Sequence, residues 1–233
     1  MGHQKENHMN RKTTHIFLAG GGGAEESKLL DEQFVRVLNL TKPLVYIPNA
    51  MRSKPYQSCL EWFRSVMTPL GVATIEMWDD IRPRYPVAGI AGVYIGGGDT
   101  VKLLKEIRGA GFDEYLREVA QNGLPLYGGS AGAIILGEDI RTTPKTSQLS
   151  ATEAAGLGII KNHSIVCHYK IDGQEVMMKL SKNLRQNIIA IPEKAGGYVV
   201  GRTLTNYGTE PIVIVQEGRA DSVNPNHSAE LKI

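Results

Sequence analysis

Residues 124–136 read LPLYGGSAGAIIL, and the order of residue types in this stretch decides the fold. Its first four residues are mostly apolar, which is typical of a short buried strand. Two glycines then precede Ser130 and Gly132 follows it, so the chain can turn sharply where side chains would clash. The apolar run from Ala131 to Leu136 predicts a helix. A strand that passes through a glycine turn directly into a helix indicates an α/β fold.

The same alternation continues upstream of this stretch. Apolar runs predict strands at 15–19, 44–47, 73–77, 92–95 and 124–127, and amphipathic stretches predict helices near 30–38, 60–70, 101–107 and 112–119. Strands that alternate with helices indicate a mostly parallel central sheet with both faces covered.

The final third of the chain has a different pattern. Strand-like runs occur at 164–168, 187–191, 198–200 and 212–215, with one clear helix near 174–184. We therefore expect hairpins that extend the sheet in antiparallel fashion.

Length and composition are those of an ordinary globular protein. The chain has 233 residues, of which 42% are hydrophobic and 21% charged, and this suits one α/β domain over residues 10–233. Residues 1–9, MGHQKENHM, have the look of an expression tag before the native start, and the alternative is a natural disordered N-terminus.

Charge and cysteine usage argue against several classes of function. The 26 basic and 24 acidic residues give a net charge of +2, without the excess expected of a nucleic-acid partner. The apolar runs are too short to cross a membrane. With two cysteines and no recognisable secretory signal, we expect a cytoplasmic protein without a disulfide framework. No metal-binding pattern occurs. The oligomeric state stays open, and a homodimer is compatible with the sequence.

Ser130 is the first candidate for a catalytic residue. Gly128-x-Ser130-x-Gly132 between a strand and a helix is the pattern of a nucleophile elbow, where a strained turn exposes the serine hydroxyl. The helix N-terminus behind the serine favours a developing negative charge. The amide of Ala131 is then the expected first donor of an oxyanion hole. The alternative is a glycine turn that only packs a helix against a strand.

A second glycine cluster, residues 96–100 (GGGDT), also follows a predicted strand and precedes a predicted helix. The amide of Gly98 is the expected second oxyanion donor. The neighbours expected to contact the substrate are Gly97, Asp99 and Gly129. The alternative is a nucleotide loop, because glycines at a helix start bind anions in general. Neither this cluster nor Gly20–Gly23 fits the known phosphate-loop or dinucleotide patterns.

A nucleophilic serine needs a base, and histidine is the usual one. The candidates outside residues 1–9 are His15, His163, His168 and His227. We favour His168 over His163 because it ends a strand-like run, at the sheet edge where ligand sites form. The acid that orients the imidazole is sought among Asp99, Asp139, Asp172 and Glu193. Cys167 has apolar neighbours and is expected to be buried and inert.

Five short segments follow one another in a recognisable order: 95–100 (IGGGDT), 127–133 (YGGSAGA), 140–143 (IRTT), 167–169 (CHY) and 191–193 (IPE). Together they resemble the peptidase E family of aspartyl dipeptidases, which has cyanophycinase as a relative. The resemblance covers roughly residues 16–215. It implies a three-layer α/β sandwich related to class I glutamine amidotransferases, and a serine peptidase acting on short peptides. The roles it implies are nucleophile for Ser130, base for His168, orienting acid for Glu193 and oxyanion hole for Gly98 and Ala131, with no metal or cofactor.

Some residues depart from that family. Gly129 stands where a tryptophan commonly precedes the nucleophile, and Pro144-Lys145 stand where an acid follows the IRTT segment. The family's arginines after the base, thought to hold an aspartyl side chain, have no counterpart in 172–178. The nearest cation is Lys179, and a lysine does not reproduce the fork of an arginine. The reaction class therefore carries over better than the aspartyl specificity.

The sequence leaves four alternatives to a dipeptidase-like enzyme. Two are hydrolases, a cyanophycinase-like β-aspartyl peptidase and an esterase. The third is a catalytically silent binding protein on the same fold. The fourth is a nucleotide binder that uses the glycine loops.

Overall fold

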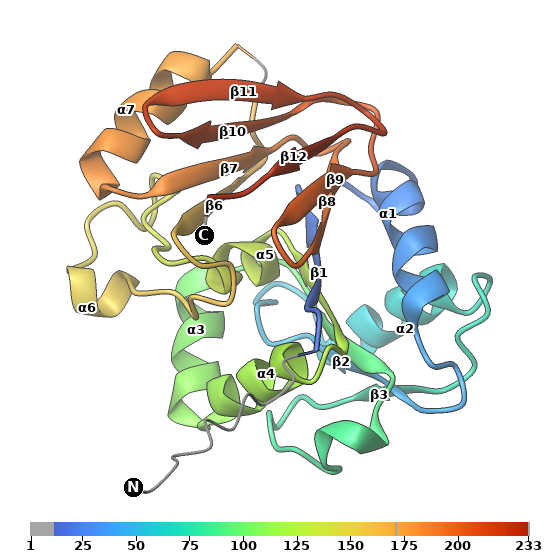
Figure 1. Ribbon diagram of the computed structural model, residues 1–233. Helices are drawn as coiled ribbons and strands as arrows, with labels where there is room; N and C mark the ends of the chain where they lie inside the picture. Colours follow the sequence, from blue (N-terminus) through green and yellow to red (C-terminus); the bar gives the residue numbers. More distant parts are fainter. Residues whose placement is uncertain (1–11, 171, 233) are drawn as a thin grey trace, which may run out of the picture.

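A central sheet of eight strands is the frame of the molecule in the computed structural model, which describes residues 12–170 and 172–232 (Figure 1). The strand order is β12-β9-β8-β1-β5-β4-β2-β3. Five neighbours pair in parallel: β1 (His15–Ala19), β5 (Pro125–Gly129), β4 (Gly92–Ile95), β2 (Leu44–Ile47) and β3 (Ile75–Met77). Three more continue the sheet in antiparallel fashion: β8 (Gly196–Val200), β9 (Thr203–Asn206) and β12 (Ser228–Glu230).

A second sheet of four strands stands beside the first. Its order is β11 (Arg219–Val223), β10 (Ile212–Gln216), β7 (Asn187–Ile191) and β6 (His163–Cys167), with β6 and β7 parallel. The expectation of one antiparallel extension is therefore right for β8 and wrong for β6, β7 and β10. β6, β7 and β10 form a sheet of their own because they are apolar on both faces, and each face must be covered by another layer. Ile189 packs into the main core, while its neighbour Ile188 packs beneath a helix.

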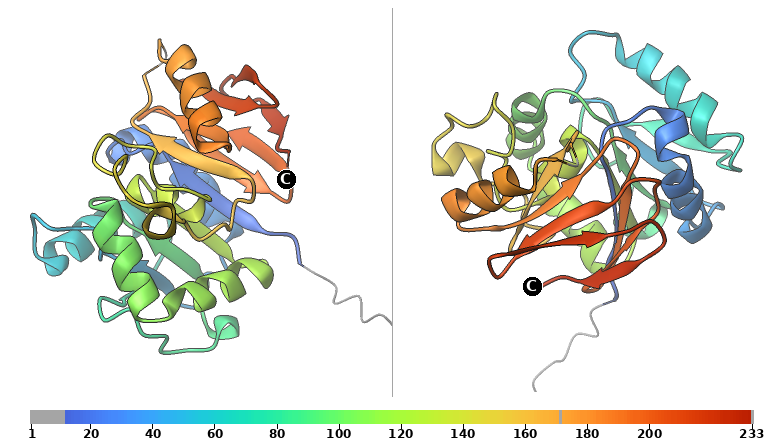
Figure 2. Two further views of the ribbon diagram at one scale, coloured as in Figure 1. Left: turned by 90° about the vertical axis from the view of Figure 1, so that its left-hand side faces the viewer. Right: turned by 90° about the horizontal axis from the view of Figure 1, so that it is seen from above.

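Helices cover both faces of the central sheet, as the alternating sequence pattern predicts (Figures 1 and 2). On one face lie α1 (Ala24–Val37) and α2 (Tyr56–Met67). On the other lie α3 (Thr100–Gly109), α4 (Phe112–Gln121) and α5 (Ala131–Leu136). The second sheet is covered by α7 (Gln174–Leu184), and α6 (Ala151–Ala154) and the 3₁₀ turn Val87–Gly89 are short connections. The result is a mixed α/β fold with a large central sheet.

The two faces of the central sheet carry different side chains. Five aromatic residues stand in register across five strands on the α1/α2 face: Tyr46, Tyr94, Tyr127, Phe17 and Tyr198. Tyr94 and Tyr127 stack with ring centroids 4.2 Å apart, and Phe17 and Tyr198 do the same. Ile16, Val45, Val93 and Leu126 each precede one of the first four strands' aromatic residues and point to the opposite face, because successive side chains of a strand alternate, whereas Gly197 precedes Tyr198.

Two sequence expectations reach beyond what these elements decide. The predicted tag at residues 1–9 lies outside the described residues. The relationship to class I glutamine amidotransferases stays a prediction. Within residues 12–170 and 172–232, no helix has the length and apolar character needed to cross a membrane.

Candidate active site

Ser130 occupies a strained turn between β5 and α5. Its backbone has φ 47° and ψ −107°, a conformation that residues with a side chain rarely adopt. The turn is fixed by the Ser130 amide, which donates a hydrogen bond to the carbonyl of Ala19 at 3.1 Å. A Cβ added at Gly128 would lie 2.5 Å from the Ala133 nitrogen, and one added at Gly132 would collide with the carbonyl of Ile95. Both glycines are therefore required by the close approach of backbone.

His168 reaches Ser130 from the second sheet. It follows β6 directly with a positive φ of 55°, and its amide donates to the carbonyl of Gly20 at 2.8 Å. Its Nε2 lies 2.9 Å from the Ser130 Oγ. Gly21, with φ 109°, lies so close that a Cβ there would collide with the imidazole ring. The Gly20–Gly23 run therefore packs against the imidazole.

Glu193 meets the other side of the same ring. It follows β7, which is the parallel neighbour of β6, so the two strand ends lie side by side. The Glu193 Oε1 lies 2.8 Å from the Nδ1 of His168. The structure thus brings together the three residues that the sequence favoured, in one chain of hydrogen bonds. The side chains of His168 and Glu193 are half-exposed, at 50% and 59%.

The other histidine and carboxylate candidates have different partners. His15 contacts the Tyr198 hydroxyl at 2.6 Å, and the fully buried His163 contacts the carbonyl of Lys161 at 2.8 Å. Asp139 forms an ion pair with Arg141 at 2.6 Å. None of these three candidates lines the cavity beside Ser130.

Three backbone amides beside Ser130 have no acceptor among the described residues. They belong to Gly97, Gly98 and Ala131. Ala131 is the first residue of α5, where an amide has no partner within the helix. Gly97 lies against the serine, since a Cβ added there would be 3.2 Å from the Ser130 Cβ. These amides are the groups available to a developing oxyanion.

Asp99 does not contact this cavity, contrary to the expectation that it binds substrate. Its carboxylate accepts from the Lys102 amide at 2.8 Å, which caps α3, and from Arg52 Nε at 2.6 Å. Partial burial disfavours the charge, but the Lys102 amide and Arg52 outweigh it and lower the pKa of Asp99. An anion at the start of α3 would therefore meet a carboxylate already in place.

Cys167 is buried directly beneath the nucleophile. Its Sγ lies 3.5 Å from the Ser130 carbonyl and 3.6 Å from that of Ala19. Burial raises the pKa of the Cys167 thiol to about 12, which leaves it protonated and unreactive. Among the residues that the structure describes, no group of three or more histidine, cysteine, aspartate or glutamate residues is arranged to hold a metal ion.

A cavity of about 450 Å³ opens beside Ser130 and His168, on the α1/α2 side of the sheet. Besides the glycines, Ala19, Ser27 and Ser58, its walls comprise Tyr46, Met51, Lys54, Cys59, Trp62 and Tyr94. Sequence reasoning missed all six. They come from β2, β4, α2 and the loop between β2 and α2, so only the strand order shows that they face one space. The one available signal was that Tyr46 and Tyr94 each stand one residue before a predicted strand end.

Behind the cavity, Asp31 of α1 is almost fully buried. Its carboxylate accepts hydrogen bonds from the Tyr127 hydroxyl at 2.7 Å and from Ser27 at 2.8 Å. Burial raises the pKa of Asp31 to about 6, although the two hydrogen bonds oppose the shift. Ser27 also lines the cavity, so Asp31 connects the cavity wall to β5, three residues before the nucleophile.

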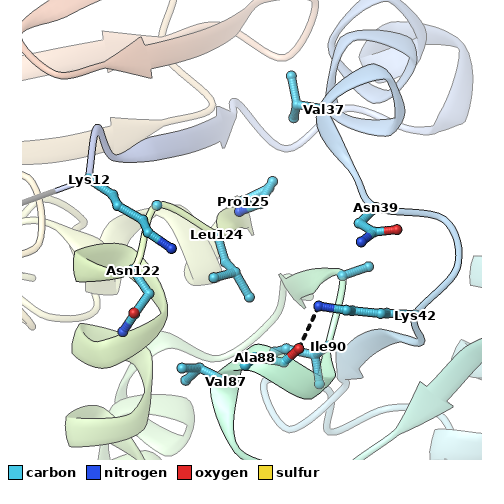
Figure 3. A pocket seen from close by; sticks show the side chains of 12 residues that line it. Lys12, Val37, Asn39, Lys42, Val87, Ala88, Ile90, Asn122, Leu124 and Pro125 are labelled. Carbon is cyan, nitrogen blue, oxygen red and sulfur yellow. Dashed lines mark hydrogen bonds between the residues drawn. The ribbon is translucent and has the colours of Figure 1, made fainter.

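A second cavity, of about 280 Å³, lies at the opposite ends of the strands (Figure 3). Lys42 donates to the Ala88 carbonyl across it at 2.6 Å. Its described walls contain no serine, histidine, cysteine or carboxylate. In open parallel sheets, ligands bind beyond the carboxyl ends of the strands, which is where Ser130 lies.

Residues 16–224 match the sequence model of peptidase family S51. The chain belongs to this family. Over 116 residues it is 31% identical to peptidase E of Shewanella amazonensis, and over 102 residues 28% identical to that of Haemophilus influenzae. These matches cover 50% and 44% of this chain, and 49% and 47% of the relatives. The chain thus spans about half the length of the curated S51 relatives that it matches.

The fold is similar to that of a solved peptidase. A solved peptidase from an acI-B1 actinobacterium superposes with a TM-score of 0.74 at 18% sequence identity. The superposition covers 94% of this chain and 98% of the other. At this identity the similarity concerns the fold, and it extends over almost all of both chains.

Proposed function

We propose that this chain is a serine peptidase that hydrolyses short peptides through an acyl-enzyme. Membership of family S51 supports peptidase chemistry. The observation that carries the proposal is the hydrogen-bonded chain from Ser130 Oγ through His168 to Glu193, at 2.9 Å and 2.8 Å. Nucleophile, base and orienting acid have this order in serine hydrolases of unrelated folds.

In this proposal each group has one role. His168 Nε2 takes the proton of Ser130 as its Oγ attacks the scissile carbonyl, and then gives that proton to the leaving amine. Glu193 accepts from Nδ1–H and so holds the tautomer whose Nε2 is free to act as base. The amides of Ala131 and of Gly98, or of its neighbour Gly97, stabilise the oxyanion. Water activated by the same imidazole releases the acyl group.

Two alternatives from the sequence lose support. A nucleotide loop at Gly96–Gly98 would place phosphate against the Asp99 carboxylate that caps α3. A silent binding protein would have no use for strained backbone, yet Ser130 has φ 47° and ψ −107°. Such strain gathers at sites where it serves a mechanism. The cavity volume of about 450 Å³ suits a small ligand such as a short peptide.

The test combines covalent labelling with turnover. We expect a fluorophosphonate to label the protein at Ser130, and the protein to release product from a panel of unblocked X-p-nitroanilides and X-Leu dipeptides. Ser130→Ala should abolish both signals, whereas Ser147→Ala, at an exposed serine that does not line the cavity, should leave both intact. Labelling or cleavage that survives Ser130→Ala would refute the proposal. A panel with β-aspartyl and ester substrates added separates the neighbouring hydrolase activities.

A further inference from the structure

The order of strands fixes which side of Ser130 each half of a substrate occupies. At the carboxyl edge of the sheet, β1 leads to Gly20, whose carbonyl accepts from the His168 amide. Its neighbour β5 leads to Ser130. Beyond β5, β4 leads to Gly96–Gly98, and β2 leads to Met51 and α2. The imidazole must reach the leaving amine to protonate it, so that half of the substrate lies toward β1. The acyl half then lies on the other side, in the cavity against α2.

The wall of this cavity toward α2 combines apolar and aromatic side chains with two polar ones, Lys54 and Ser58. Met51 and Cys59 line it beside Trp62, whose indole is 45% exposed although it is one of the largest apolar side chains. Tyr46 and Tyr94 form its floor, and burial raises the pKa of both hydroxyls, so they remain neutral. A ligand side chain that covers exposed aromatic surface inside a concave site removes a large apolar area from water, and this burial contributes strongly to binding.

Charge around the same cavity is unfavourable to a carboxylate. Lys54 is the one lysine or arginine among its described lining residues, and it is exposed to solvent. Arg52 is paired with Asp99, and Lys102 with Glu106 at 2.9 Å. A carboxylate placed on the tyrosine floor could accept from a tyrosine hydroxyl, but it would lose water without gaining a charged partner there.

We propose that the residue on the acyl side of the bond cleaved at Ser130 has an aromatic or large aliphatic side chain, held between Trp62, Met51 and the tyrosine floor. This inference rests on the proposed function, since it assigns the substrate class of the same site. It separates this chain from the aspartyl specificity that the resemblance suggests. The side chain stacks on the Trp62 indole and displaces water from an apolar wall.

The closing experiment measures side-chain preference without turnover. Aminoboronic acids with the side chains of phenylalanine, leucine and aspartate form reversible tetrahedral adducts with an active serine, and each protects Ser130 from fluorophosphonate. We expect the phenylalanine and leucine analogues to protect at concentrations at least about 10-fold lower than the aspartate analogue, since each group placed in an apolar pocket changes affinity about 10- to 200-fold.

Variants then assign the preference to this wall. Trp62→Ala should weaken protection by the phenylalanine analogue about 10-fold and should change protection by an alanine analogue much less, because alanine does not reach the indole. Leu40→Ala removes a similarly exposed apolar side chain just before β2, at the opposite ends of the strands, and should change neither. Since Trp62 is on the surface of α2, its removal should leave the thermal unfolding midpoint nearly unchanged.

The outcomes separate this inference from the proposed function. Labelling of Ser130 with stronger protection by the aspartate analogue would overturn the inference and leave the serine peptidase standing. Loss of that preference in Lys54→Gln would then identify Lys54 as the partner of the carboxylate. A Ser130 that neither fluorophosphonate nor any boronic acid modifies would overturn the proposed function, and the inference with it.

Discussion

The serine half and the histidine half of the candidate site are held in different ways. Ser130 stands between β5 and α5, whose residues are all buried, and the glycines around it touch backbone. His168 and Glu193 stand in the loops after β6 and β7, with side chains 50% and 59% exposed. Packing therefore fixes the nucleophile, whereas the base and the acid are oriented mainly by hydrogen bonds, with the Gly21 backbone against the imidazole. Substitutions of the glycines around Ser130 should lower the stability of the protein, whereas substitutions of His168 and Glu193 should lower turnover with little change in stability.

Removing the base should give the largest effect. His168→Ala is expected to lower kcat about 10⁴- to 10⁶-fold, as in serine hydrolases whose residues act as a unit, with little change in the free energy of unfolding. His227→Ala, another exposed histidine whose contact is with the Pro225 carbonyl, is the matched control for turnover. A large loss of stability in His168→Ala would show that this half of the site is also held by packing.

Removing the charge of the acid should have a smaller effect. Glu193→Gln is expected to lower kcat about 10- to 1000-fold, less than the about 10⁴-fold known where the orienting acid is buried, because water screens an exposed carboxylate. Glu217→Gln, an exposed glutamate that faces Lys232 at 3.9 Å, is the control. Full activity in Glu193→Gln would exclude an orienting role for this carboxylate.

In the serine half, the burial of Asp31 should make the stability of the protein depend on pH. Burial raises the pKa of Asp31 from 3.8 to about 6, so the folded state holds this proton more tightly than the unfolded state. Stability contributed by the protonated group is present below pH 3.8, is lost as the pH rises to about 6, and amounts to about 3 kcal/mol. Asp31→Asn cannot ionise, so its stability relative to wild type should increase between pH 4 and pH 7. Urea unfolding of both proteins at several pH values measures this, and parallel curves would contradict it.

A single methyl group gives the sharpest test of the packed half. Gly132→Ala places a Cβ against the Ile95 carbonyl and should lower the free energy of unfolding by about 1–3 kcal/mol. Gly109→Ala has open space around it at the end of α3 and should be neutral or raise stability by up to about 1 kcal/mol. Equal effects of the two substitutions, measured by urea unfolding, would mean that the turn at Ser130 can relax.

The same difference explains what the sequence could predict. The strand, glycine turn and helix around Ser130 are local, and residue types alone indicate the turn because only small residues fit it. His168 and Glu193 come together through the parallel pairing of β6 and β7, which the hydrophobic pattern did not distinguish from a hairpin. Asp99 was expected to bind substrate because it lies in a loop next to the predicted site. In the structure its carboxylate instead accepts hydrogen bonds from the Lys102 amide of α3 and from Arg52. The cavity wall required the order of four strands, which no local pattern contains.

The placement of Trp62 gives the molecule an optical reporter. The chain has two tryptophans, and the other, Trp78, is fully buried away from the site. Its emission should therefore lie to the blue and stay constant when a ligand binds. The indole of Trp62, at the cavity wall and 45% exposed, should emit to the red and shift as water leaves its surface. Ligand binding in the cavity can thus be followed by tryptophan fluorescence in the Ser130→Ala protein, where no reaction takes place.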